Sequence, residues 1–284
     1  MPDDDSHDGN FEEDESDEDD DDSEDETVKP SASKRSRLLD STPLDVSAAT
    51  TIAVNPNSKV SNGPKPIIIL LDQATIETVK NKRGVYELLN CDDHRELCKR
   101  KLKVDPNNYR PDILHQELLS LLDSPLNKAG LLKVYIQTKK NVLIDVHPSI
   151  RIPRTYKRFA GLIVQLLHKM KIKAGTESTT LLKVIKNPFA QYLPPGTRCF
   201  GMSCKGTLYS PISLASSLVP STYDPQDQIL ATVCFIVGAM STGHITLEDH
   251  PYMEKMFSIS SYPLSGAAAL SRIVTGIEHH WGIV

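Results

Sequence analysis

Short runs of apolar residues, separated by turn-forming residues, most constrain how this chain can fold. The run Pro66-Ile-Ile-Ile-Leu-Leu71 fits a β-strand that is buried on both faces, as the strands of parallel sheets are. A second run, Phe235-Ile-Val-Gly-Ala-Met-Ser-Thr-Gly243, breaks into a loop of small residues. Segments with apolar residues at helical spacing lie between these runs. The alternation predicts an α/β domain with a mainly parallel sheet flanked by helices.

The same spacing assigns several other segments to strands or helices. Further strands are expected over residues 131–136, 142–146, 182–185 and 230–237. Helices are expected from an N-cap at Asp112, from an N-cap at Thr155 to about Met170, and from Leu264 to Ile277. Pro263 lies where it could open the last of these helices.

Charge is distributed very unevenly along the 284 residues. Residues 1–27 contain eleven Asp, six Glu and no Lys or Arg, which leaves 32 basic and 20 acidic side chains for the remaining residues. The acidic segment has almost no apolar residues to offset its chain entropy, so we expect it to be disordered. We predict an acidic tail and linker over residues 1–63 and one domain over residues 64–284. The tail either competes with an anionic partner for the basic surface of the domain, aids solubility, or binds another protein.

Several classes of protein are excluded by the sequence. No apolar run approaches 18 residues and no signal-peptide core is present, so we expect neither a membrane span nor secretion. The five cysteines form no CxxC pair and the nine histidines lack metal spacing, which predicts reduced thiols and no metal site. A Rossmann oxidoreductase is disfavoured because no GxGxxG follows the run at residues 67–71.

Two loops offer main-chain groups and carry no catalytic side chain. In the first, Gly238 and Gly243 leave room for a ligand to approach the main chain. The second is Ile259-Ser-Ser-Tyr-Pro-Leu-Ser265. Side by side, these loops would bind an uncharged heterocycle such as adenine through main-chain hydrogen bonds. The alternative is a pair of ordinary strand–loop turns.

A cluster of basic residues begins in a loop and ends in the first turn of a helix. Arg151, Arg154 and Arg158 follow one another at spacings of three and four, and we expect these like charges to be packed without a nearby acid. Guanidinium groups bind phosphate bidentately and stack on bases, and a helix N-terminus also favours phosphate. The cluster therefore indicates an anionic partner, although a solvated basic face would have the same pattern. Lys34-Arg-Ser-Arg37 has the composition of a nuclear import signal.

Many segments, in the same order along the chain, resemble the SPOUT (α/β-knot) methyltransferases. Within that class they resemble the branch that methylates N1 of a pseudouridine in small-subunit rRNA and assists ribosome biogenesis. The resemblance covers roughly residues 64–284. The segments that carry it are Tyr86-Glu-Leu-Leu-Asn-Cys91, Arg110-Pro-Asp112 with His115-Gln116, Asp123-Ser-Pro-Leu-Asn127, Arg151-Ile-Pro-Arg-Thr155, Val164-Gln-Leu-Leu-His168, Val184-Ile-Lys-Asn-Pro188, Val237-Gly-Ala239, Ser258-Ile-Ser-Ser-Tyr-Pro-Leu-Ser265 and Trp281-Gly282.

The resemblance implies a C-terminal trefoil knot, S-adenosyl-L-methionine as cofactor and a small-subunit rRNA loop as substrate. It also implies a homodimer that meets other ribosome assembly factors in the nucleus and nucleolus. The C-terminal helix, with Ala267, Ala268, Ala269 and Ser271, is the expected dimer contact. The implied cofactor-binding residues are Ser210, Gly238, Gly243, Ile259, Ser260, Ser261, Tyr262, Pro263 and Leu264. RNA contacts are implied for Arg110, Arg151, Arg154 and Arg158, with Asp112 either holding Arg110 in position or capping its helix.

No residue pattern announces a general base, so no catalytic residue is assigned and we expect catalysis by positioning. The sequence departs from the family at Ser241-Thr242-Gly243, where relatives commonly have a His before the glycine, and at Gly266, which weakens a helix start. These departures bear on cofactor affinity. The alternative function is a non-catalytic RNA-binding assembly factor that keeps the fold.

Overall fold

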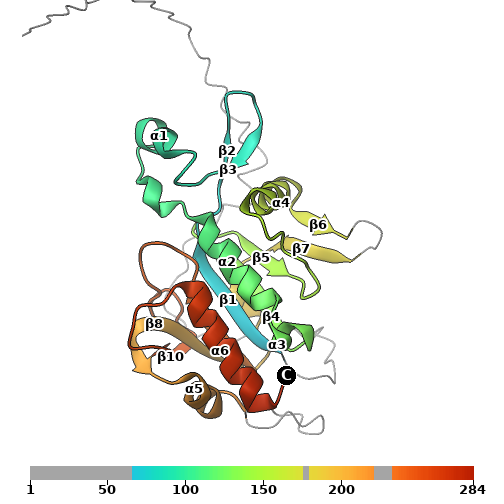
Figure 1. Cartoon of the computed structure of the whole chain (residues 1–284), viewed down its shortest axis with the longest axis vertical. Helices are drawn as coiled ribbons and strands as arrows, with labels where there is room; N and C mark the ends of the chain where they lie inside the picture. Colours follow the sequence, from blue (N-terminus) through green and yellow to red (C-terminus); the bar gives the residue numbers. More distant parts are fainter. Residues whose placement is uncertain (1–65, 175–178, 221–231) are drawn as a thin grey trace, which may run out of the picture. The chain divides into compact units, whose positions relative to one another are not determined.

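An eight-stranded sheet forms the centre of the protein. The computed structural model describes residues 66–174, 179–220 and 232–284, so the predicted tail and linker lie outside the described residues. The strands lie in the order β10-β8-β9-β1-β4-β5-β7-β6, and β2 and β3 form a separate hairpin (Figure 1). Their bounds are β1 Ile67–Ala74, β2 Thr78–Lys80, β3 Tyr86–Leu88, β4 Leu132–Thr138, β5 Leu143–Val146, β6 Lys171–Lys173, β7 Thr180–Ile185, β8 Arg198–Leu208, β9 Val233–Gly238 and β10 Met253–Ser258.

Five neighbouring strands of the sheet, from β10 to β4, are parallel, and the remaining pairs are antiparallel. Strand β1 lies inside this arrangement, with β9 on one side and β4 on the other. Its first five residues are no more than 3 % exposed. The prediction of a mainly parallel sheet, with a doubly buried strand at residues 67–71, is confirmed.

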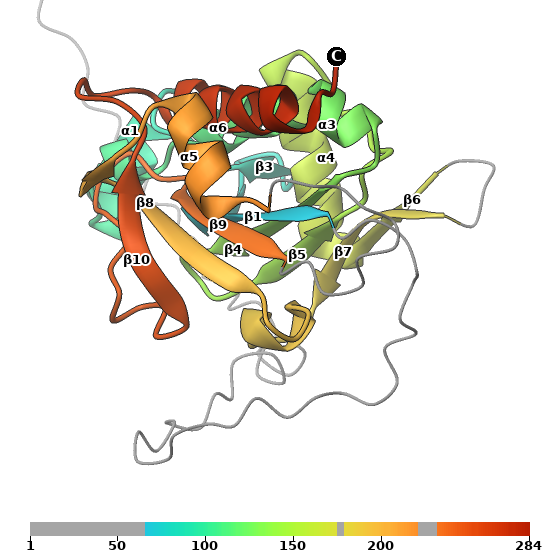
Figure 2. The same ribbon diagram turned by 90° about the horizontal axis from the view of Figure 1, so that it is seen from below.

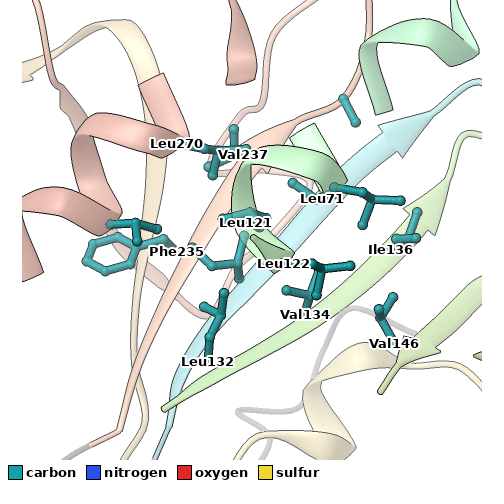
Figure 3. Close-up of a cluster of buried hydrophobic side chains, with 14 of the residues drawn as sticks. Leu71, Leu121, Leu122, Leu132, Val134, Ile136, Val146, Phe235, Val237 and Leu270 are labelled. Atoms are coloured by element: carbon teal, nitrogen blue, oxygen red, sulfur yellow. The ribbon is translucent and has the colours of Figure 1, made fainter. Parts of the chain in front are cut away.

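Helices cover one face of the sheet (Figure 2). In Figure 3, Leu121 and Leu122 of α2 and Leu270 of α6 point toward strand side chains such as Leu71 and Val237. The α-helices are α1 Arg95–Leu97, α2 Pro111–Leu122, α3 Pro125–Lys128, α4 Tyr156–Lys169, α5 Pro211–Leu218 and α6 Gly266–Trp281. Shorter helical turns are η2 Cys98–Leu102, η3 Pro106–Asn108 and η4 Phe189–Tyr192.

The opposite face of the sheet is covered by loops. Ile68 and Leu70 of β1 form a second core there with Phe189 of η4 and with Ile245. Ile245 belongs to the loop between β9 and β10, which spans residues 239–252 and is called the β9–β10 loop below. This loop is therefore part of a hydrophobic core as well as a connection between strands.

Several predicted helix starts differ from the structure. Asp112 is not the N-cap of α2: Arg110 is, and Pro111 occupies the first helical position, where its fixed backbone angle and missing N–H are favourable. Thr155 is the N-cap of α4, but its hydroxyl makes no capping hydrogen bond. Pro263 does not open α6, because that helix begins at Gly266 after the N-cap Ser265. The predicted strand 230–237 begins at Val233, and residues 230 and 231 lie outside the described ranges.

In the ranges that the structure describes, no helix is both long and apolar enough to span a bilayer. All five cysteines are free thiols, and four of them are buried.

Candidate cofactor and RNA site

Three loops leave the sheet at the carboxyl ends of the parallel strands β8, β9 and β10. This edge is where open α/β sheets bind ligands. The loops carry the residues for which the family resemblance implies cofactor binding: Ser210 after β8, Gly238 and Gly243 after β9, and residues 259–264 after β10. The loops after β9 and β10 do not leave neighbouring strands, because β8 lies between those two strands.

The main chain of two loops is available to a ligand. Within the described residues, the N–H groups of Thr242, Gly243, Ser261 and Leu264 have no hydrogen-bond acceptor, and all four residues are exposed. Gly243 has a φ of +103°, which only glycine adopts without strain. These donors fit a ligand that is recognised through main-chain hydrogen bonds.

Packing within the protein explains the glycine at position 238, and helix capping explains the serine at position 210. A Cβ at Gly238 would lie 2.7 Å from the Met240 side chain and 3.7 Å from that of Ile245, so the space beside this glycine is already filled. The Ser210 hydroxyl caps α5 and accepts the Ser213 N–H at 3.1 Å. The space beside Gly238 is therefore filled, and the Ser210 hydroxyl is already hydrogen-bonded. Only the main-chain groups of these two residues remain for a ligand.

Ser241 and Thr242 tie the β9–β10 loop to a distant segment. The Ser241 hydroxyl donates to the Asn107 carbonyl at 2.6 Å, and the Thr242 hydroxyl donates to Asn108 Oδ1 at 2.7 Å. The two asparagines close η3, two to three residues before Arg110. Both side chains therefore make contacts across the fold that the sequence alone does not reveal.

Arg110 is held in a fixed orientation by Asp112. Arg110 Nε donates to Asp112 Oδ1 at 2.8 Å and its Nη2 donates to Oδ2 at 2.7 Å, a bidentate pair. The Arg110 guanidinium holds the pKa of the Asp112 carboxyl below its usual range, and Asp112 in turn raises the pKa of Arg110. The pair therefore stays ionised at neutral pH and presents the half-buried guanidinium in one geometry.

The start of α4 is fixed against α2, which places its arginines at the surface. His115 of α2 contacts the Pro153 carbonyl through Nε2 at 2.7 Å and stacks on Phe159 with ring centroids 4.4 Å apart. Both His115 and Phe159 are buried. Arg151, Arg154 and Arg158 are exposed around this anchor.

The expectation that these arginines have no acid nearby is wrong for Arg154. Its Nη2 donates to Asp123 Oδ2 at 3.0 Å, across 31 residues of sequence. Arg151 and Arg158 make no ion pair within the described part of the chain. The Arg154 pair is exposed and therefore contributes little stability.

Glu117 is a buried acid that we did not predict near the cofactor loops. It is 0 % exposed, and both carboxyl oxygens lack a hydrogen-bond partner within the described residues. Burial raises its pKa well above the usual value of 4.5. A Cβ at Gly266, the first residue of α6, would overlap Glu117 Oε1. Helical spacing alone places residue 117 on α2, but only the packing of α2 on α6 reveals that it is enclosed.

The sequence of this chain is similar to those of known proteins. Residues 69–278 match the model of the family described as EMG1/NEP1 methyltransferase. A mouse protein named ribosomal RNA small subunit methyltransferase NEP1 is 48% identical over 222 residues, which cover 78% of this chain and 84% of that protein. A Candida glabrata protein of the same name is 46% identical over 230 residues, which cover 80% of this chain and 94% of that protein.

A solved structure is similar to this chain in fold. It is Archaeoglobus fulgidus Nep1 bound to S-adenosylhomocysteine, with a TM-score of 0.61 and 24% sequence identity. The likeness covers 76% of this chain and 99% of the archaeal one. The family match spans most of the domain and the relatives are aligned over most of their length. The chain therefore belongs to the EMG1/NEP1 methyltransferase family.

Proposed function

We propose that this protein uses S-adenosyl-L-methionine to methylate N1 of a pseudouridine in small-subunit rRNA. The names of the relatives support the reaction class, and the archaeal neighbour bound to S-adenosylhomocysteine supports the cofactor. The observation that carries the proposal is a set of free main-chain donors at Thr242, Gly243, Ser261 and Leu264. They lie in loops at one edge of the sheet, and the first loop is hydrogen-bonded to the segment that leads into Arg110.

We assign to the residues of this chain the binding of the cofactor and the orientation of the target base. When bound, the cofactor supplies a methyl group activated by a positively charged sulfur. The loops after β8, β9 and β10 hold it through main-chain groups, with Ser210, Gly238, Gly243 and residues 259–264 in that role. N1 of pseudouridine gives up its proton to water as it accepts the methyl group, because no side chain is assigned as its base. We propose that catalysis comes from orientation, with Arg110 stabilising negative charge on the base.

RNA binding is assigned to the exposed arginines. Arg151, Arg154 and Arg158 contact the phosphates of the rRNA loop, and Arg110, held by Asp112, lies deeper and meets the target nucleotide. A loop is the expected target because its bases leave the stack at low cost. Arg154 can exchange Asp123 for phosphate readily, since an exposed ion pair contributes only about 0–1 kcal/mol.

We further propose that the C-terminal segment of the domain forms a trefoil knot and that the protein acts as a homodimer in ribosome biogenesis in the nucleolus. Exposed apolar side chains on this segment support a dimer contact: Leu208, Ile212, Tyr262 and Leu264. Of the small residues expected on α6, Ala268 and Ser271 are exposed. Ala269 is 3 % exposed and packs inside the chain, so it is left out of this contact.

The second candidate is a non-catalytic RNA-binding assembly factor. The observation that favours it is the Ser241-Thr242-Gly243 sequence, which lacks the histidine common in relatives. Calorimetry with S-adenosylhomocysteine separates the two candidates, because only the enzyme must bind it. An RNA-binding protein that shows no heat of cofactor binding would favour the assembly factor.

Two glycines provide a matched pair of variants for this measurement. Gly243→Val should abolish cofactor binding, since position 243 has a φ of +103° and its free N–H is one of the donors that we propose for the ligand. Gly130→Val also forces a side chain onto a positive φ, of +75°, but it lies in the turn before β4, and a Cβ there has open space. The Gly130→Val protein should bind the cofactor normally.

A further inference from the structure

Beneath the β9–β10 loop lies a buried polar cluster that no step above uses. Asp72 and His250 are 4 % and 5 % exposed. His250 Nε2 lies 2.8 Å from Asp72 Oδ2, and His250 Nδ1 lies 2.8 Å from the Tyr252 hydroxyl. The three side chains come from the end of β1 and from the end of the β9–β10 loop, 178 residues apart in sequence for Asp72 and His250.

One placement of the protons gives each of the three side chains a hydrogen-bond partner. The Tyr252 hydroxyl donates to His250 Nδ1, and His250 Nε2–H donates to the Asp72 carboxylate. Burial raises the pKa of Tyr252, so its hydroxyl keeps the proton that it donates. A buried carboxylate is costly unless it is hydrogen-bonded. Asp72 is therefore satisfied only while His250, and the loop that carries it, stays docked on the sheet.

Asp72 also anchors the beginning of the same loop. Its main-chain carbonyl accepts the Ala239 N–H at 2.8 Å, and its Cα is paired in register with that of Gly238. One residue at the carboxyl end of β1 thus holds the loop at both ends. The segment between the two anchors contains Thr242 and Gly243, whose main-chain donors are free within the described ranges.

We propose that Asp72 and His250 are positioning residues that fix the β9–β10 loop, and with it the main-chain groups that the cofactor meets. The inference rests on the proposed function for the identity of that ligand, but the anchoring of the loop is independent of it. A loop held at both ends loses little conformational entropy when the ligand binds. Ser241, Thr242 and Ile245 hold the first half of the loop, so releasing the His250 end frees the second half and adds the entropy of that half to the cost of binding.

The test compares two histidines of the same loop in the full chain. His250→Ala removes the anchor, whereas His244→Ala removes an exposed side chain that makes no hydrogen bond within the described residues. Amide hydrogen exchange of residues 239–252 is measured without ligand, and S-adenosylhomocysteine affinity is measured by calorimetry. We expect His250→Ala to speed exchange in the loop and to weaken cofactor binding about tenfold or more. RNA affinity, and both properties of His244→Ala, should match the wild type.

Conservative variants separate positioning from a general loss of stability. His250→Gln can still donate to Asp72 from a similar distance and should recover much of the cofactor affinity that His250→Ala loses. Tyr252→Phe leaves the contact between His250 and Asp72 intact and should bind the cofactor nearly as well as the wild type. If His250→Ala fails to fold, His250→Gln and Asp72→Leu carry the test, because Leu is similar in shape to Asp and cannot accept a hydrogen bond from His250. Weaker cofactor binding by Asp72→Leu than by His250→Gln supports the proposal, and equal binding contradicts it.

Two results would overturn it. The first is a folded His250→Ala protein with the loop exchange and cofactor affinity of the wild type. The second is equal loss of cofactor affinity in His250→Ala and His250→Gln. If the wild type itself binds no cofactor, the proposed function fails, and the exchange data alone decide whether the cluster holds the loop: unchanged exchange in His250→Ala then overturns the inference.

Discussion

The first residue of α6 is a glycine, although alanine would form a more stable helix by about 0.5–1 kcal/mol. The reason lies on the neighbouring helix, because a Cβ at Gly266 would overlap the buried carboxyl of Glu117. Glycine is unfavourable at a helix start and a carboxyl group is unfavourable in the interior. The two are nevertheless compatible here, because the missing side chain of Gly266 leaves space for Glu117. This pair lies directly after the loop at residues 259–264, next to the proposed cofactor site.

A double-mutant cycle tests this pairing. Gly266→Ala alone should destabilise the protein, since the new methyl group must displace a buried side chain. In a Glu117→Ala background the same change should stabilise the protein by about 0.5–1 kcal/mol through helix propensity. Free energies of unfolding from urea titrations provide the measurement. Equal effects of Gly266→Ala in both backgrounds would contradict the pairing.

The buried acid should also give the protein a pH-dependent stability. Because the pKa of Glu117 is raised in the folded state, its stabilising contribution is complete below its usual pKa of 4.5 and is lost as pH rises through the folded-state pKa. Glu117→Gln keeps the shape and cannot ionise. The unfolding free energy of the wild type should therefore fall relative to that of Glu117→Gln as the pH is raised. Parallel pH profiles for the two proteins would refute this expectation.

Residues of this kind also limit what a sequence can predict. The partner of Arg110 is two positions away, so the Arg-Pro-Asp order suggests the bidentate pair. Glu117 is buried against Gly266 of another helix, and His250 has its partner on another strand. Nothing in the local sequence of either residue distinguishes it from a surface residue. Asp112 was assigned as a cap because Asp often caps helices, but Pro111 takes the first helical position and moves the cap to Arg110.

At the scale of elements, burial decided which strands could be predicted. Strands β1, β4, β5, β7 and β9 are apolar enough to be recognised from sequence. The edge strands β6 and β10 are partly exposed and carry polar residues. Strand β8 lies inside the sheet, but its second half is also partly exposed, and its register with β10 shifts at two places. Edge strands and bulges lack the regular apolar pattern that predicts an interior strand.

The start of α4 should dominate the affinity for RNA. Replacing Arg151, Arg154 and Arg158 together by Ala should weaken RNA binding and flatten its salt dependence, with roughly 0.7–0.9 fewer ions released per lost phosphate contact. Cofactor binding should not change. The matched control replaces Lys171, Lys173 and Lys183 by Ala. These lysines are exposed on β6 and β7, and their replacement removes the same charge. If the salt dependence of RNA affinity falls equally in both triple variants, the arginines have no special role.

At the scale of the whole molecule, the charge of the sequence predicts a regulatory role for its first residues. Residues 1–27 carry a charge of −17 and the remaining chain carries +12. Because this segment is covalently attached to the domain, we expect it to compete with RNA at a high effective concentration. It should weaken non-specific binding more than binding of the correct loop, which also gains base contacts.

Deleting residues 1–27 tests this competition. The shortened protein should bind scrambled RNA more tightly than the full chain at low salt, and the difference should shrink as salt screens the charges. Affinity for the cognate loop should change less. Equal affinities of both proteins for scrambled RNA at low salt would rule competition out and leave solubility as the role of the tail.

The topology of the whole chain is the part that sequence pattern predicts least. Apolar periodicity specifies which residues are buried, but it does not specify how the chain passes between strands, and threaded chains are rare. The knot and the dimer are therefore inferences from family membership. The match to the EMG1/NEP1 family over residues 69–278 is what connects the loops and the arginines to one reaction.

The most direct test of the central claim is methyl transfer to RNA. The purified protein, labelled S-adenosyl-L-methionine and an rRNA hairpin with pseudouridine in its loop are combined, and the modified base is identified by mass spectrometry. The account predicts one methyl group on N1 of that pseudouridine and none on a hairpin with uridine at the same position, where N1 is bonded to the ribose. It also predicts no transfer by Gly243→Val. Saturating RNA and cofactor without any methyl transfer to the pseudouridine hairpin would contradict it.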